Sequence, residues 1–206
     1  MRTTWRWPRD HDEGDLIVSE MDEVIPALVA AVQEQHATGD HYRDDAIRQA
    51  MEHQAQLALR PGPVRVDVIV DPPWSDGQIN SVQVVTGDRP FLVDTVASCL
   101  LRHGWRVEDV RHPIIGVKRD RGTIEAVGMP GRGGCASESW IHIDATAPLG
   151  TDIGQAAEQL RDDLCACLDQ VVCATDDWGA MHEAMLRTAE LVSASSGPAE
   201  DRDSSR

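Results

Sequence analysis

The segment Thr-Gly-Asp-Arg-Pro-Phe-Leu-Val-Asp at residues 86–94 joins an apolar strand to an amphipathic helix. In the strand before it, valines alternate with Gln83, as in a partly buried strand. After it, apolar side chains recur at helical spacing as far as Gly104, which suits the end of a helix. We expect Asp88 to cap the first N–H groups of this helix and Pro90 to lie in its first turn. The segment therefore predicts a strand, a tight turn and a helix in succession.

The rest of the chain predicts a single α+β core whose neighbouring strands are antiparallel. Apolar residues that recur with a period of two indicate strands, and those with a helical period indicate helices. Asp120-Arg121-Gly122 is typical of a hairpin turn. We expect strands at residues 64–70, 79–85, 105–118 with a break at Pro113, 123–127 and 139–145, and helices at 16–36, 44–59, 90–103, 153–171 and 177–192.

These ranges divide the chain into four parts. Residues 1–14 are charged and aperiodic, so we expect them to be disordered. Residues 15–60 form an N-terminal helical segment, and residues 61–192 form the main domain with a C-terminal helix. The tail at 193–206 is too polar to pack and is expected to be disordered.

The composition favours a soluble, cytoplasmic protein. The 206 residues contain 35 acidic and 19 basic side chains, for a formal charge of −16, which disfavours nucleic acid and anionic membranes as partners. The five cysteines are odd in number and show no CxxC spacing, which is typical of reduced thiols. Residues 24–32 are the longest apolar run, too short to span a bilayer, and no secretory signal opens the chain.

Most motifs that suggest chemistry have a simpler structural interpretation. The loop 131–134 is rich in glycine but enters a strand, whereas a dinucleotide fingerprint opens a helix. Cys165 and Cys167 are two residues apart on a helix, so they project to different sides and cannot share a metal. His112 and His142 lie on strands that could be close, and a carboxylate such as Glu138 or Asp144 could complete a metal set with them. We favour a structural role for both imidazoles, and no metal site is assigned.

The turn after residue 87 is the candidate site for an effector or an interface. Turns that lead from a strand into a helix hold effectors in many small regulatory domains, because the N–H groups at a helix start attract anionic groups. The alternative is that the turn only caps and packs its helix. The residues assigned to this candidate site are Asp88, Arg89, Pro90, Phe91, Leu92 and Asp94.

Four motifs together resemble the N-terminal region of the large bacterial NAD-dependent glutamate dehydrogenases. They occur in the order and at the approximate separations of that family. Each motif alone would be weak, and the set is specific. The motifs are GDRPFLVDTVASCLLRHGW from Gly87, RHPIIGVKRD from Arg111, ESWIHID from Glu138 and DDWGAM from Asp176.

This resemblance implies an ACT-type domain, a ferredoxin-like βαββαβ antiparallel sheet backed by helices. ACT domains often pair side by side and bind amino acids at the shared interface. Two departures are relevant: Phe91 stands where ligand-binding ACT domains usually have glycine, and the fourth ACT strand has no clear candidate after the second helix. We expect the ring of Phe91 to pack in the domain's own core or against a partner, and Val64 to Val70 to supply the extra strand.

The resemblance does not extend to catalysis. In the family, glutamate is oxidised in a distant C-terminal region that binds NAD, and this chain has no strand-linked GxGxxG and only one lysine, Lys118. We assign no catalytic or cofactor-binding residue. The leading hypothesis is a noncatalytic regulatory and assembly module, either the N-terminal part of such a dehydrogenase or a freestanding relative. Its partners would be a second copy or the rest of the enzyme. The alternatives are a freestanding amino-acid sensor and a small metal enzyme that uses His112 and His142.

Overall fold

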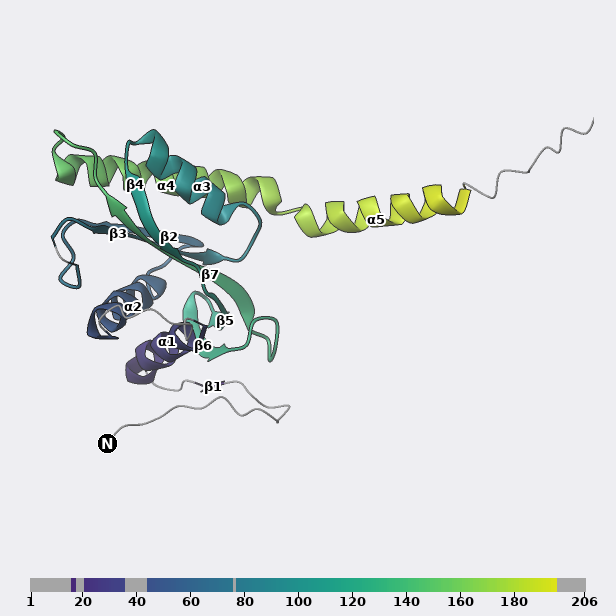
Figure 1. Cartoon of the computed structure of the whole chain (residues 1–206). Coiled ribbons are helices and arrows are strands. Elements are labelled where there is room, and N and C mark those ends of the chain that lie inside the picture. The colour runs from purple at the N-terminus through teal and green to yellow at the C-terminus, as the bar shows by residue number, and fades with distance from the viewer. Residues whose placement is uncertain (1–15, 18–20, 36–43, 76, 196–206) are drawn as a thin grey trace, which may run out of the picture. The chain divides into compact units, whose positions relative to one another are not determined.

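The computed structural model describes residues 16–17, 21–35, 44–75 and 77–195 (Figure 1). The expected disordered segment 1–14 and residues 196–206 lie outside this part. The described residues up to Val171 form one compact unit, and those from Val172 belong to a second. The division of the chain expected from the sequence into segments at 15–60 and 61–192 stays a prediction.

Seven strands and five helices make up the described part of the chain. They follow the sequence patterns closely, because nearly every boundary lies within a few residues of its expected position. In chain order they are β1 (Leu16–Ile17), α1 (Met21–Gln35), α2 (Asp44–Ala58), β2 (Val64–Ile69), β3 (Asn80–Gly87), α3 (Leu92–Arg102), β4 (Arg106–Arg111), β5 (Ile114–Asp120), β6 (Thr123–Gly128), β7 (Ala136–Thr146), α4 (Ile153–Thr175) and α5 (Trp178–Ser195).

All pairings in the sheet are antiparallel, and β7 is at its centre. The strand order is β1-β6-β5-β7-β3-β2, and β4 also pairs with β7. β4 and β5 share one edge of β7, one after the other, because His112 and Pro113 break the strand between them. The break that we expected at Pro113 is therefore confirmed.

β2 supplies the extra strand that the sequence predicted. It pairs with β3 along its whole length, from Val64 opposite Thr86 to Ile69 opposite Ser81. In a βαββαβ fold the last strand lies beside the first, and here β2 takes that place beside β3. The α+β architecture, with an antiparallel sheet backed by helices, is confirmed.

Helices cover both faces of the sheet (Figure 1). α1 and α2 lie on one face, where Leu28, Ala55 and Leu57 pack against Val85 and Trp140. α3 and α4 lie on the other, where a second apolar cluster includes Val84, Val96, Ile141 and Leu164. Alternate residues of β3 and β7 enter opposite clusters, as the period of two requires.

The two ends of the described chain differ from the sequence expectation. Leu16 and Ile17 were expected to begin the first helix, but they pair with Val127 and Ala126 of β6 as β1. A two-residue strand is too short to show a period of two, so the helical pattern that follows concealed it. At the other end, α5 continues to Ser195, beyond the expected end at residue 192.

Candidate functional site

The turn between β3 and α3 begins the helix without a side-chain cap. Phe91 is the N-cap residue, with φ = 72° and ψ = 5°, and no side-chain hydrogen bond caps the helix there. This left-handed conformation is uncommon for a bulky residue and is usually taken by glycine. The prediction that Asp88 caps α3 is wrong, because the turn is longer than a capping box allows.

Asp88 instead fastens the turn to β7. Its backbone N–H donates to the carbonyl oxygen of Ser137 (2.8 Å), and its Oδ1 accepts a hydrogen bond from the hydroxyl of Ser139 (2.6 Å). Because the Ser139 proton points to Asp88, Nε2 of His112 is the donor to Ser139 Oγ, at 3.0 Å. Burial lowers the pKa of His112, and the nearby Asp88 opposes that shift. This chain of three polar groups holds the turn against the break between β4 and β5.

The outer side of the turn is exposed, whereas Leu92 is buried. Asp88 and Asp94 are exposed, and the ring of Phe91 is 56% exposed. The prediction that this ring packs in the domain's own core is therefore wrong, while packing against a partner stays a prediction. Arg89 folds back on the turn, where its Nε donates to the carbonyl oxygen of Gly87 at 3.4 Å.

An ion pair between Glu138 of β7 and Arg119 of β5 lies beside the turn. Glu138 is opposite Gly87 in the sheet, and its two carboxylate oxygens accept hydrogen bonds from Arg119 at 2.6 and 3.0 Å. Arg65 lies near this pair, and burial, followed by the charge of Arg119, lowers the pKa of its guanidinium. Two arginines thus share one nearly buried carboxylate, and bidentate pairs of this kind fix side-chain geometry.

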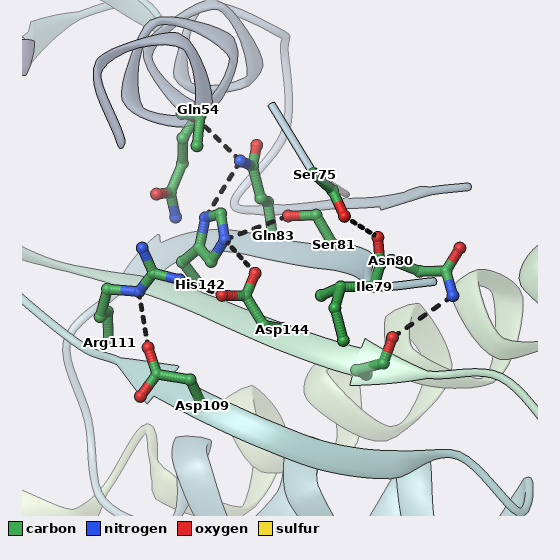
Figure 2. A network of polar contacts seen from close by, with 12 residues as sticks. Gln54, Ser75, Ile79, Asn80, Ser81, Gln83, Asp109, Arg111, His142 and Asp144 are labelled. Atoms are coloured by element: carbon green, nitrogen blue, oxygen red, sulfur yellow. Dashed lines mark hydrogen bonds and ion pairs between the residues drawn. The ribbon is translucent and has the colours of Figure 1, made fainter. Parts of the chain in front are cut away.

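A second cluster of polar side chains is buried under α2, on the face of the sheet opposite the Ser139 hydroxyl (Figure 2). His142 is at its centre. Its Nδ1 accepts a hydrogen bond from the Gln83 amide at 3.2 Å, so its Nε2 carries the proton and faces Asp144 Oδ1 at 3.0 Å and Ser81 Oγ at 3.2 Å. Asp144 also pairs with Arg111. Burial is the main reason why the pKa of His142 is lowered, so the imidazole is neutral in the folded protein.

This buried network connects α2 to the sheet. The Gln83 amide also donates to the carbonyl oxygen of Ala50 (2.9 Å), and its Oε1 accepts from Nδ1 of His53 (2.8 Å). Gln54 of α2 donates to the carbonyl oxygen of Ile141 at 2.9 Å. A cavity of about 10 Å³ lies beside His142, lined also by Gln54, Arg111 and Met51. That volume suits a single water molecule.

The two histidines considered as metal ligands lie on opposite faces of β7. His112 reaches the hydroxyl of Ser139, whereas His142 lies under α2. Among the described residues, no three His, Cys, Asp or Glu side chains are grouped so that they could hold a metal ion. The two imidazoles act in separate hydrogen-bond networks.

A family model described as "Glutamate dehydrogenase, ACT1 domain" matches residues 27–164. The chain belongs to this family. The match reaches from within α1 to within α4, so it includes the candidate turn, both polar clusters and every strand except β1. The comparison with curated proteins gave no match.

Within this ACT1 domain, sequence reasoning missed the network around His142. The signal was present, since Gln83 interrupts the run of valines in β3 and stands opposite His142 in the sheet. Two other residues of this region, Gln54 and Arg111, come from an amphipathic helix and a mostly exposed strand, where polar residues are expected on the solvent side. No helix in the described ranges has both the length and the apolar character needed to cross a membrane.

Proposed function

We propose that this ACT1 domain is a noncatalytic module for regulation and assembly in the glutamate dehydrogenase family. The parent reaction converts glutamate and NAD to 2-oxoglutarate, ammonia and NADH. The observation that carries the proposal is the family match over residues 27–164, which includes nearly the whole helix-covered sheet. In the leading form of the proposal, the partner of the module is a second copy or the dehydrogenase region of the enzyme.

The polarity of the groups at the turn supports a noncatalytic role. A serine nucleophile needs a base that accepts its proton. Here the Ser139 hydroxyl donates to the Asp88 carboxylate and accepts from His112, so the imidazole is not placed to accept the hydroxyl proton as the base of a nucleophilic serine would. Ser139 is also fully buried. These groups therefore position the turn.

The exposed ring of Phe91 supports the assembly role. It lies on the outer side of a turn that Asp88 and Ser139 hold in place, and an aromatic ring on a fixed turn is a good anchor for an interface. Sedimentation velocity over a range of protein concentrations tests this role. We expect self-association that Phe91→Asp weakens by at least about tenfold and that Asp120→Asn, at an exposed position outside the candidate turn, leaves unchanged. A monomer at all concentrations that also fails to bind a glutamate dehydrogenase region would contradict it.

The noncatalytic part of the proposal is tested by an NADH assay. Purified protein is mixed with glutamate and NAD, and absorbance is followed as protein concentration is varied. We expect no NADH formation that scales with the polypeptide. A rate that does scale, and that survives repeated chromatography, would show the chain to be an enzyme.

The second candidate function is an amino-acid sensor at the same turn. The start of α3, which no side chain caps at Phe91, favours it, because N–H groups at a helix start attract a carboxylate. Calorimetry against the common amino acids tests this candidate. Binding to the wild type that tightens in Phe91→Gly would support a sensor in which the ring restricts access. Absence of heat with both proteins, under conditions where the module self-associates, would leave assembly as the role.

A further inference from the structure

Two cysteines face each other where α3 packs against α4. Both helices lie on the same face of the sheet (Figure 1), and they run antiparallel in contact: His103 at the end of α3 pairs with Asp163 of α4 at 2.7 Å. Cys99 is one helical turn before His103 in α3, and Cys167 is one turn after Asp163 in α4. The pairing of His103 with Asp163 places the two cysteines at the same level of the helix pair, where Cys99 is fully buried in the apolar cluster and Cys167 packs against that cluster.

An arginine joins these two thiols. Nη2 of Arg102 lies 3.1 Å from Sγ of Cys167, and Arg102 itself is three residues after Cys99 on α3. Thiols become reactive where a cation stabilises the thiolate and solvent can reach the sulfur. Cys167 is half-buried and lies next to an exposed arginine, whereas Cys99 is fully buried, so Cys167 is the sulfur that a hydroperoxide can reach.

We propose that Cys99 and Cys167 form a redox-active dithiol site, which a hydroperoxide converts to a disulfide that links α3 to α4. Cys167 is the thiol that reacts first, Cys99 is the resolving thiol, and Arg102 is a positioning residue. The site is on the face of the sheet opposite the His142 network and does not depend on the proposed function.

The reaction takes two steps. The Cys167 thiolate attacks one oxygen of hydrogen peroxide, the O–O bond breaks, and a sulfenic acid and one water form after proton transfer. The Cys99 sulfur then attacks the sulfenic sulfur, the S–O bond breaks, and the departing hydroxide takes the Cys99 proton and leaves as a second water. Both thiols are oxidised by one electron each, and the peroxide is reduced to two molecules of water.

The buried state of Cys99 suits the resolving role. Burial raises the pKa of the Cys99 thiol, and the hydrogen bond from Arg102 opposes that shift. Cys99 thus stays protonated and unreactive until its neighbour is oxidised. The rest of the cysteines are placed differently: Cys135 is buried, Cys173 is exposed, and burial together with nearby aspartates raises the pKa of Cys165.

The experiment treats the full chain with hydrogen peroxide, blocks the remaining thiols by alkylation and maps disulfides by mass spectrometry. We expect a peptide pair linked through Cys99 and Cys167, a mass loss of about 2 Da for the two hydrogens removed, and reversal by dithiothreitol. Because the bond closes a long loop, we expect the Tm to rise by roughly 5–10 °C on oxidation.

Three variants test the assignment. Cys167→Ser should abolish both the linked peptide and the rise in Tm, and Cys165→Ser, altered on the same helix, should keep both. Arg102→Gln should slow the formation of the disulfide by about fivefold without changing the mapped pair. The proposal is overturned if peroxide modifies the exposed Cys173 while Cys99 and Cys167 stay unlinked. It is also overturned if Cys167→Ser retains the rise in Tm, or if Cys167 stops at a sulfinic acid.

Discussion

At the level of single residues, Phe91 has a backbone conformation that is unfavourable for a bulky side chain. A non-glycine residue in the left-handed region has its Cβ close to a neighbouring carbonyl oxygen, at a cost of about 1 kcal/mol or more. Phe91 has φ = 72° and a ring that is 56% exposed, so burial of the ring offsets only part of that cost. A requirement outside the folded domain, such as the proposed interface, is consistent with keeping the ring there.

This strain leads to a prediction about stability. Alanine variants are usually more stable than glycine variants, and at Phe91 we expect the reverse. Phe91→Gly and Phe91→Ala both remove the ring, but only the glycine variant relieves the left-handed backbone. We expect Phe91→Gly to be more stable than Phe91→Ala by about 1 kcal/mol, measured by urea unfolding. The control pair is at Asp94, which is exposed and within α3, where alanine should be the more stable by about 1 kcal/mol. The same order at both positions would show that Phe91 is unstrained.

His142 leads to a prediction about pH. Its pKa in the folded protein is lowered, so below pH about 6.5 the unfolded chain binds a proton that the folded chain does not. The stability of the protein should therefore fall on acidification, by up to about 1.4 kcal/mol per pH unit for this group. His112, whose pKa is also lowered, acts in the same direction, and the lowered pKa of Asp144 adds a loss of stability at still lower pH.

Chemical unfolding at pH 7.5, 6.5 and 5.5 measures this dependence. His142→Gln removes one titrating group, so we expect a lower stability at pH 7.5 but a shallower fall below pH 6.5. If the fall is equally steep in both proteins, then the imidazole of His142 is not kept neutral by the fold.

Residue-level roles were the hardest to predict from the sequence. Asp88 is of the right type for a cap, but the cap depends on the backbone path, and the path places Phe91 at that position. Likewise, the pairing of Gln83 with His142 depends on the register between β3 and β7, which no single-strand pattern specifies.

At the level of elements, the contact between β5 and β6 depends on Gly116. A Cβ on Gly116 would lie 2.5 Å from the carbonyl oxygen of Gly128 and 2.5 Å from the carbonyl carbon of Met129. Both are backbone atoms of β6 and of the residue after it, so relief would require the strands to separate. The requirement for glycine at position 116 could not be predicted from the sequence, because Gly116 lies within an apolar run and not in a turn. It also does not come from the backbone conformation, because the φ of Gly116 is not left-handed.

We predict that Gly116→Ala destabilises the protein by roughly 2–3 kcal/mol, which is a typical cost of forcing atoms into a packed site. Gly87→Ala is the matched control, because its Cβ would meet only the end of the Arg89 side chain at 3.5 Å. Thermal unfolding of both variants measures the difference. Equal Tm values for the two variants would mean that β5 and β6 can move apart at little cost.

Element types, in contrast, followed from local patterns. The alternation in β2 and β3 and the apolar stripes of α2 and α3 are long enough to define their periods. The breaks at Pro113 and at Gly104, where φ = 75°, follow from the backbone preferences of these residues. β1 was not predicted because its partner β6 is over a hundred residues away in the chain.

At the level of the whole molecule, the described residues form two compact units, which meet at Val171 and Val172 within α4. The side chains that distinguish the units are those of α4 that enter the sheet-facing cluster, Leu160, Leu164 and Leu168, whereas residues 178–193 of α5 are all exposed.

The last prediction concerns the stability of α5 alone. α5 has 18 residues, and its described side chains at 178–193 are exposed, with Met185 at 69% and Leu191 at 71%, so it gains little from burial and is marginal in water. In hydrogen exchange of dilute protein, amides of α5 should exchange at least about 100-fold faster than those of β3 and β7, which open only with the whole core. Raising the protein concentration should slow exchange in α5 if assembly covers its apolar residues. Protection of α5 equal to that of β7 in dilute protein would mean that burial on the chain itself stabilises the helix.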